Sequence, residues 1–217
     1  MLELKLGRNT KEVKEFLFIG AHCDDIEIGC GGVTLRLAKE YSQATFRWVV
    51  FSSNEQRIAE ARLSSDLFLA SVVSKVVIIK DFRNGYFPYI GAAIKDYFEE
   101  LKQMVKPDVI FTHYGQDYHQ DHRVLSELTW NTFRDHFILE YEIPKYDGGL
   151  SSPNVFFPLR QSEYERKVEI LLKCFASERS KRWFTKDTFL GLMRLRGGEC
   201  NAPSGYAEAF YCRKAMI

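Results

Sequence analysis

The sequence predicts an α/β fold with three layers: a mostly parallel, doubly wound, Rossmann-like sheet with helices on both faces. Short apolar runs alternate with longer amphipathic stretches over the first two-thirds of the 217 residues. The apolar runs are nearly continuous, as in strands buried on both faces. Neither a linker nor a repeat divides the chain. Right-handed crossovers between such strands generate a doubly wound sheet.

The elements of the first two-thirds follow from composition and periodicity. Apolar, β-branched and aromatic content predicts four strands, at residues 16–20, 45–53, 75–82 and 108–113. The amphipathic stretches between them predict helices at residues 31–41, 55–70 and 90–105. Asn54 suits the N-cap of the second helix, and Lys106-Pro107-Asp108 ends the third.

The pattern changes after Asp135. Residues 138–144, 154–159 and 206–215 are expected to form strands, and residues 163–176 and 185–195 helices. Because no linker precedes this part, we expect one domain over residues 1–217, in which about 136–217 are an elaboration that shapes the substrate pocket.

Composition excludes several classes of protein. Thirty Lys and Arg face 29 Asp and Glu, so a net charge of +1 gives no sign of nucleic-acid binding. No apolar run approaches the roughly 20 residues of a transmembrane helix. The polar N-terminal stretch shows no secretory signal. Five cysteines without regular spacing suit a reducing compartment, so we expect a cytoplasmic protein.

Histidine placement locates the chemistry. His22 follows the first predicted strand, whereas His113, His119 and His122 lie at or after the end of the fourth. In a sheet of order 3-2-1-4 these two strands are neighbours at the topological switch point, where ligands bind beyond the carboxyl ends. The sequence therefore predicts that two segments about 90 residues apart meet in one crevice.

Two imidazoles and one carboxylate, with a fourth position open to water, form a catalytic zinc site. His22 and Asp25 could supply two ligands and His122 the third. Adjacent side chains generally point in different directions, so one of Asp24 and Asp25 can bind the metal while the other accepts a proton from the metal-bound water. Zinc lowers the pKa of that water to about 7.

The remaining side chains supply an acid. A protonated His119, held by a carboxylate such as Asp121, could stabilise an oxyanion and protonate a leaving amine. The cluster thus suits metal-assisted hydrolysis of an amide or ester. Two histidines and a carboxylate also bind Fe²⁺, so the identity of the divalent ion stays open.

Three segments resemble one known family. Residues 22–32 (HCDDIEIGCGG) resemble the HPDD(x)EIGxGG segment of the PIG-L/LmbE-like zinc deacetylases. Residues 117–123 (DYHQDHR) resemble the family's HxDH motif, and residues 206–210 (YAEAF) its closing segment. The order and spacing also match, and the similarity spans most of the chain.

The resemblance implies a role for each matching residue: zinc ligands His22, Asp25 and His122, general base Asp24, oxyanion and leaving-group residue His119, and Asp121 orienting the histidine. It also implies the Rossmann-like fold and removal of acetyl from an N-acetylated amino sugar, commonly N-acetylglucosamine, as a small molecule or glycoconjugate. Members often form trimers or hexamers, so a homo-oligomer is expected. Cys23 stands where the family usually has Pro. It could be a soft competing ligand, but we interpret it as a small buried spacer, because better ligands already fill the site.

Other residues have weaker signals. Arg57 either contacts substrate, as an Arg in this region of the family often does, or only solvates its helix. Asp117 either caps the second loop or contacts substrate, and Arg196 is expected to reach the crevice from the last third. His113 is interpreted as structural, bonding within the second loop. Residues 86–89 (YFPY) could stack on a sugar or plug the space between helices.

The sequence therefore predicts a zinc-dependent de-N-acetylase. One alternative is a metal-dependent esterase or phosphoesterase that uses the same pocket. Another is a metal-binding or sugar-binding module without catalysis. The presence of Asp24 and His119 argues against the latter, because neither is needed merely to bind metal.

Overall fold

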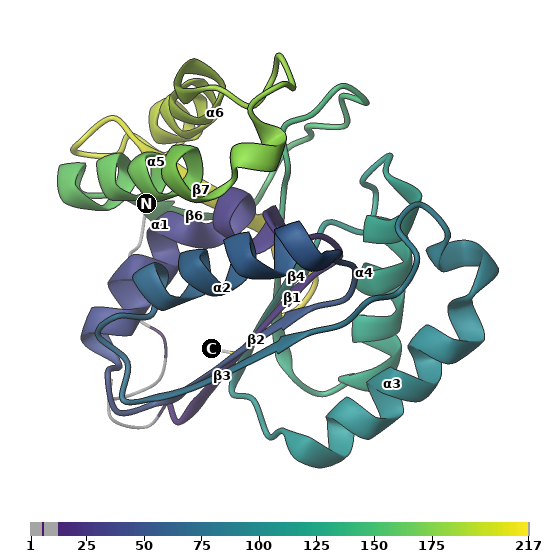
Figure 1. Ribbon diagram of the computed structural model, residues 1–217. Coiled ribbons are helices and arrows are strands. Elements are labelled where there is room, and N and C mark those ends of the chain that lie inside the picture. The colour runs from purple at the N-terminus through teal and green to yellow at the C-terminus, as the bar shows by residue number, and fades with distance from the viewer. Residues whose placement is uncertain (1–5, 7–12, 217) are drawn as a thin grey trace.

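The computed structural model of the protein describes residues 6 and 13–216, so most of the polar N-terminal stretch, where we see no secretory signal, lies outside the described residues. One seven-stranded sheet, of order β3-β2-β1-β4-β5-β7-β6, forms the centre of the fold (Figure 1). Its strands are β1 (Glu15–Gly20), β2 (Thr45–Val50), β3 (Ser74–Ile79), β4 (Val109–His113), β5 (Phe137–Tyr141), β6 (Val155–Pro158) and β7 (Ala207–Tyr211).

The first four strands have the predicted order, 3-2-1-4. Strands β1 to β5 run parallel, and β7 pairs antiparallel with both β5 and β6. The first and fourth strands are neighbours, with Phe16 opposite Val109 and Phe18 opposite Phe111. The strand order reverses at β1, which creates a crevice at the carboxyl ends of β1 and β4.

Helices cover both faces of the sheet. They are α1 (Asp25–Glu40), α2 (Glu55–Phe68), α3 (Gly91–Met104), α4 (Gln120–Thr132), α5 (Gln161–Cys174) and α6 (Lys186–Glu199), with short 3₁₀ turns η1 (Phe87–Tyr89) and η2 (Ala176–Glu178). Figure 1 shows α1, α2 and α5 on one face and α3 and α4 on the other. The three-layer α/β prediction is thus confirmed. Two helices differ from the prediction: α1 begins at Asp25 rather than near residue 31, and α4 was not predicted.

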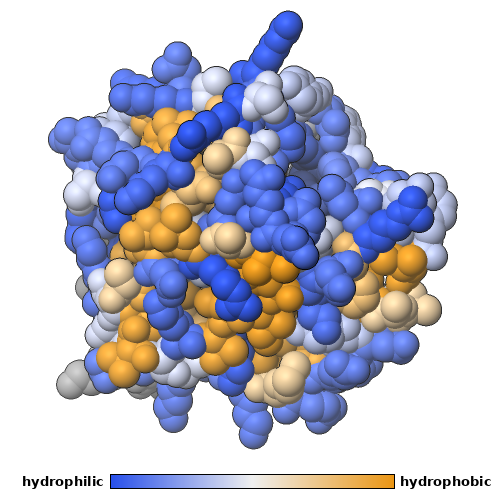
Figure 2. All heavy atoms as spheres, in the orientation of Figure 1, coloured by the Kyte–Doolittle hydropathy of each residue, from blue (hydrophilic) through white to orange (hydrophobic). Residues whose placement is uncertain are grey.

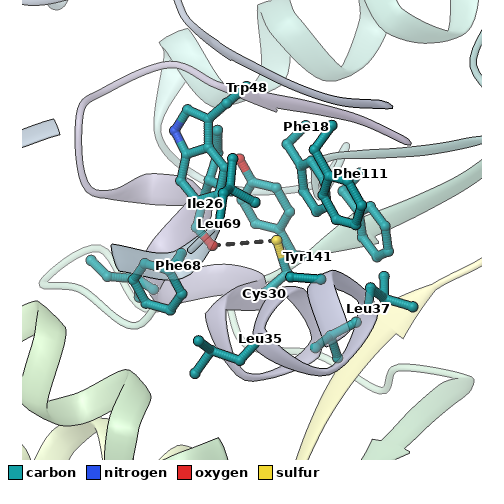
Figure 3. Packing of buried hydrophobic residues seen from close by; sticks show 14 of the residues in the cluster. Phe18, Ile26, Cys30, Leu35, Leu37, Trp48, Phe68, Leu69, Phe111 and Tyr141 are labelled. Atoms are coloured by element: carbon teal, nitrogen blue, oxygen red, sulfur yellow. Dashed lines mark hydrogen bonds between the residues drawn. The ribbon is translucent and has the colours of Figure 1, made fainter. Parts of the chain in front are cut away.

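Strand β1 shows why the sheet is covered on both sides. Phe16 and Phe18 belong to the hydrophobic cluster beneath α1, α2 and α5, whereas Leu17 and Ile19 belong to the cluster beneath α3 and α4. The Phe18 ring stacks on Phe111 of β4 with centroids 4.8 Å apart (Figure 3). Alternate side chains point to opposite faces of a strand, so β1 has no face for water.

Helix α1 is broken at Cys30, whose backbone angles (φ −144°, ψ 21°) are not helical. The Cys30 thiol donates to the Ile26 carbonyl (3.3 Å; Figure 3). Just before the break, Gly29 lies against the ring of Tyr141, and a Cβ at this glycine would lie 2.1 Å from a ring carbon. The short segment of α1 before the break therefore packs tightly on β5.

Hydrophilic side chains cover most of the face in Figure 2, and apolar patches lie among them. Within the described part of the chain, each helix is too short or too polar to cross a membrane. All five cysteines are free thiols, and four of them are buried.

Candidate active site

A cavity of about 190 Å³ opens at the carboxyl ends of β1 and β4. The sequence-predicted residues that line it are His22, Asp24, Asp25, Arg57, His119 and His122. Its remaining wall comes mainly from the last third of the chain, through Ile143, Lys145, Tyr146, Asp147, Lys181 and Trp183. The crevice expected at the switch point is therefore present.

The two motifs reach the cavity from adjacent strands. His22 lies two residues after the end of β1, Asp24 is the N-cap of α1 and Asp25 its first residue. His119 is the N-cap of α4 and His122 lies in the first turn of that helix. Because β1 and β4 are hydrogen-bonded neighbours, side chains 100 residues apart lie against one another.

Three of these side chains bring donor atoms together. His22 Nδ1 lies 3.3 Å from His122 Nε2 and 3.2 Å from Asp25 Oδ2. Asp25 Oδ1 lies 3.5 Å from His122 Nε2. Ligand atoms about 2.0–2.1 Å from a tetrahedral zinc ion are separated from one another by about 3.3 Å. The donor set and its spacing therefore fit a zinc ion.

A second carboxylate lies behind each imidazole. The far nitrogen of His22, Nε2, lies 3.3 Å from Asp121 Oδ2, and Nδ1 of His122 lies 3.0 Å from Asp117 Oδ2. In the neutral rings these carboxylates hold the proton on the outer nitrogen. Consequently the inner nitrogens present lone pairs to each other and to Asp25. Such a group of electron-rich atoms requires a proton or a cation between them.

The pKa values of the site reflect this arrangement. Burial opposes protonation of His22, but the Asp25 charge and hydrogen bonds to Asp121 and Asp25 raise its pKa to about 10. Burial would raise the pKa of Asp25, yet the neighbouring imidazoles His122, His113 and His22 hold it well below its usual range. The site thus stabilises positive charge beside an ionised carboxylate.

His113 contributes a further imidazole. The sequence led us to expect hydrogen bonds within the second loop, but His113 Nε2 accepts the Ala21 N–H (2.9 Å) from the first loop. It also lies 3.2 Å from Asp25 Oδ2. The structure contains two groups of three side chains whose potential ligand atoms lie within 4.8 Å of one another inside the group. The first group is His22, His119 and His122, and the second is Asp25, His113 and His122.

Asp24 forms an ion pair with Arg57, whose Nη2 lies 2.6 Å from Asp24 Oδ1. The same guanidinium nitrogen lies 3.3 Å from Glu178 Oε1. Burial raises the pKa of Asp24, and Arg57 partly opposes the shift. Arg57 therefore lies in the cavity rather than only on the helix surface.

His119 and Asp121 differ from their expected partnership. The Asp121 carboxylate bonds to His22 and accepts the N–H groups of Gly85 (2.6 Å) and Phe87 (3.1 Å). The hydrogen bond between His119 and Asp121 involves the Asp121 backbone rather than its carboxylate: the Asp121 N–H donates to His119 Nδ1 (3.3 Å). Burial, followed by the charges of His122 and His22, lowers the pKa of His119 to about 4. At neutral pH His119 is therefore a neutral ring with its proton on Nε2.

Sequence reasoning missed the residues of the far wall. Lys145 Nζ lies 2.7 Å from the Asp117 carboxylate, which it shares with His122. Tyr146 accepts the Arg182 N–H through its hydroxyl (3.1 Å), so two loops of the last third are joined beside the cavity. Isolated Lys and Tyr residues in polar loops carry no motif that could have identified them.

Arg196 lies outside the cavity wall, so the expected contact between Arg196 and the substrate is corrected. Its guanidinium is buried and bonds to Glu142 through Nε (2.6 Å) and Nη2 (2.7 Å). Nη1 bonds to Glu199 (2.8 Å), and Nη2 also donates to the Ser151 carbonyl (3.0 Å). These contacts occupy the Arg196 guanidinium, and within the described part of the chain the cavity is lined by other residues.

Two open interpretations can now be compared with the structure. Within the loop at 86–89, Phe87 is fully buried whereas Tyr86 and Tyr89 are exposed, so one ring plugs the fold and two face solvent. Cys23 is buried with its thiol 3.5 Å from the Ser52 carbonyl, as expected of a spacer.

Comparisons with known proteins agree with this geometry. The sequence profile of the family described as GlcNAc-PI de-N-acetylase matches residues 17–133, which include both motifs. N,N'-diacetylchitobiose deacetylase from Pyrococcus horikoshii is 20% identical, with a TM-score of 0.68 over 96% of this chain and 86% of that one. The zinc-inhibited form of teicoplanin deacetylase is 11% identical, with a TM-score of 0.67 over 92% of this chain and 97% of that one.

A third similar structure has a different activity. The 4-carboxy-2-hydroxymuconate hydratase from Pseudomonas putida is 15% identical, with a TM-score of 0.74 over 94% of this chain and 98% of that one. At these identities structural likeness establishes the fold alone. The family match covers more than half of the chain and contains both groups of cavity residues. The chain belongs to the GlcNAc-PI de-N-acetylase (PIG-L) family.

Proposed function

We propose that this protein is a zinc-dependent hydrolase that removes the N-acetyl group from an amino sugar of the N-acetylglucosamine type. The substrate would be a small molecule or a glycoconjugate. One observation carries the proposal: the inner atoms of His22, Asp25 and His122 face one another at 3.2–3.5 Å, and each imidazole is backed by a carboxylate. The family match and the deacetylases of similar fold support the same activity.

His22, Asp25 and His122 would hold the ion. Bound there, zinc would supply a Lewis acid for the acetyl carbonyl and would lower the pKa of the attacking water. Asp121 and Asp117 would orient the two imidazoles. Fe²⁺ accepts the same donors, so metal analysis has to identify the native ion.

Asp24 would act as the general base. It lines the cavity beside Asp25, and its raised pKa brings the carboxylate closer to the range that suits proton transfer near neutral pH. Arg57 holds the carboxylate in place through the 2.6 Å ion pair. Once Asp24 has taken a proton from water, the resulting acid can return it to the departing amine nitrogen.

His119 would stabilise the developing oxyanion. Its Nδ1 accepts a backbone N–H, so Nε2–H is free to donate to the substrate carbonyl oxygen. The low pKa of His119 favours this role for a neutral hydrogen-bond donor over that of an imidazolium acid. His119 would therefore stabilise the oxyanion, as the sequence predicts, whereas Asp24 rather than His119 would deliver the proton to the amine.

The last third would determine which sugar binds. We propose that residues 136–217 are an elaboration of one domain, because β7 and β6 extend the same sheet and loops from this part line the cavity. Trp183 and Tyr146 offer aromatic faces on which a sugar ring can stack. Five free thiols suit the reducing cytoplasm as its location.

The test is metal analysis of the purified protein combined with an amine-release assay on N-acetylated sugars. We expect one zinc per chain and release of primary amine and acetate in equal amounts. A matched panel of sugar acetates and sugar phosphates tests the esterase and phosphoesterase alternatives. Ester or phosphate hydrolysis without amine release, or a protein that binds no divalent ion, would refute the proposal.

A further inference from the structure

The break in α1 has an unusual cause. In a continuous helix the Gly32 N–H would donate to the Ile28 carbonyl, and the Val33 N–H to that of Gly29. Here the chain leaves the helical conformation at Cys30, so these groups need other partners. A buried helix end without partners is strongly destabilising.

An ion pair from the last third fills the gap. Lys167 Nζ donates to the Ile28 carbonyl (2.5 Å) and to Glu208 Oε1 (2.6 Å). Glu208 Oε1 accepts the Gly32 N–H (2.8 Å), and Oε2 accepts the Val33 N–H (2.7 Å). The pair is thus inserted into the helical hydrogen bond between residues 28 and 32.

Neither member of the pair belongs to the cavity that holds the donor atoms. Lys167 lies on α5 and Glu208 on β7, within the closing YAEAF segment, and both side chains are 3% exposed. Removing two charges from water is costly, and apolar replacements of such pairs often stabilise a protein. Stability alone therefore gives a weak reason for this pair.

We propose that the Lys167–Glu208 pair positions Asp25 for metal binding, an inference that rests on the proposed function. Asp25 opens the short segment of α1 before the break. Side chains inserted into the hydrogen-bond ladder of a helix bend it. Without the pair, the freed N–H groups of Gly32 and Val33 would bond again to the carbonyls of residues 28 and 29. The first turn would then rotate, and Asp25 would move away from the two imidazoles.

The variant K167M/E208L tests the inference because it removes both charges and leaves no single buried ion. Apolar replacement of a buried pair is generally tolerated. We expect a folded protein whose affinity for Co²⁺ or Zn²⁺, measured by competition with a chelator, is at least about tenfold weaker. The matched control is R36M/E163Q, which removes a pair joining the regular part of α1 to α5 (Arg36 Nη2 to Glu163 Oε2, 2.6 Å).

The control should bind metal as tightly as the wild type. The absorption spectrum of bound Co²⁺ gives a second readout, because it reports the coordination geometry, which a purely structural role would leave unchanged. If K167M/E208L does not fold, E208Q is the deciding variant, because Gln replaces one of the two acceptor oxygens with an NH₂ donor and leaves Lys167 without its counter-ion. The inference is overturned if the deciding variant has the same metal affinity and the same Co²⁺ spectrum as the wild type. A wild type that binds no metal would instead refute the proposed function.

Discussion

Asp117→Asn gives the sharpest test of the outer carboxylates. Burial works against ionisation of Asp117, yet the hydrogen bond to His122, the charge on that ring and the Lys145 ammonium hold its pKa well below the usual range. The carboxylate is therefore charged at neutral pH. It lies 3.0 Å from His122 Nδ1 and 2.7 Å from Lys145 Nζ. Asn keeps the size and one acceptor but removes the charge that makes the imidazole a stronger ligand.

The expected loss follows from this contact. Removing an outer-shell partner of a metal-bound histidine typically weakens metal binding by about 10–100-fold, or about 1.4–2.7 kcal/mol. Chelator competition at neutral pH measures it directly. Asp66→Asn is the matched control, because Asp66 also lies 2.7 Å from a lysine, Lys75, but on the exposed surface. Equal metal affinity of Asp117→Asn and Asp66→Asn would refute the reasoning.

Three other predictions concern the base, the pH dependence and a buried pair. Asp24→Asn should keep its metal, by elemental analysis, while kcat falls by about 10²–10⁴-fold; near-normal turnover would remove the base assignment. Because the pKa of His22 is raised to about 10 in the metal-free site, a proton occupies the ligand position at neutral pH. Metal binding must displace this proton, so affinity should rise with pH by about tenfold per unit below that pKa; a pH-independent affinity contradicts it. Arg196→Met strands the buried Glu142 carboxylate and should cost about 3–5 kcal/mol, or roughly 10 °C in Tm, with unchanged metal affinity. An unchanged Tm, or lost metal binding, would contradict that structural role.

Local pattern was sufficient to predict the first four strands of the sheet, but not the position of β7 between β5 and β6. Continuous apolar runs at β1 and β4 identified parallel strands buried on both faces, and the strand order 3-2-1-4 of a doubly wound sheet made them neighbours. The same adjacency brought His22 and His122 together. By contrast, α4 was missed because its first turn consists of polar side chains, and the start of α1 was missed because acidic residues and glycines obscure the helical period around Cys30.

Side-chain partners could not be predicted in the same way. Spacing along the chain placed Asp121 next to His119, but the turn between them points the carboxylate towards His22, 99 residues away. The prediction for Arg196 was wrong because its partner is distant in the sequence. A basic residue before two glycines does not reveal that its side chain will pair with the buried carboxylate of Glu142, just after β5. Such pairings depend on the orientation of whole elements, which no local sequence pattern encodes.

The insertion of Lys167 and Glu208 into α1 has a consequence for building chimeric enzymes. The metal-binding donor atoms come from the first 133 residues, whereas much of the cavity wall comes from the segment after residue 136. A chimera that joins the N-terminal part of one relative to the C-terminal part of another is therefore an obvious way to change substrate selectivity. The inserted pair fastens the two halves together. A chimera whose C-terminal part lacks an equivalent lysine and glutamate would leave backbone groups of α1 without hydrogen-bond partners. The exchangeable part is therefore limited to the loops around the cavity.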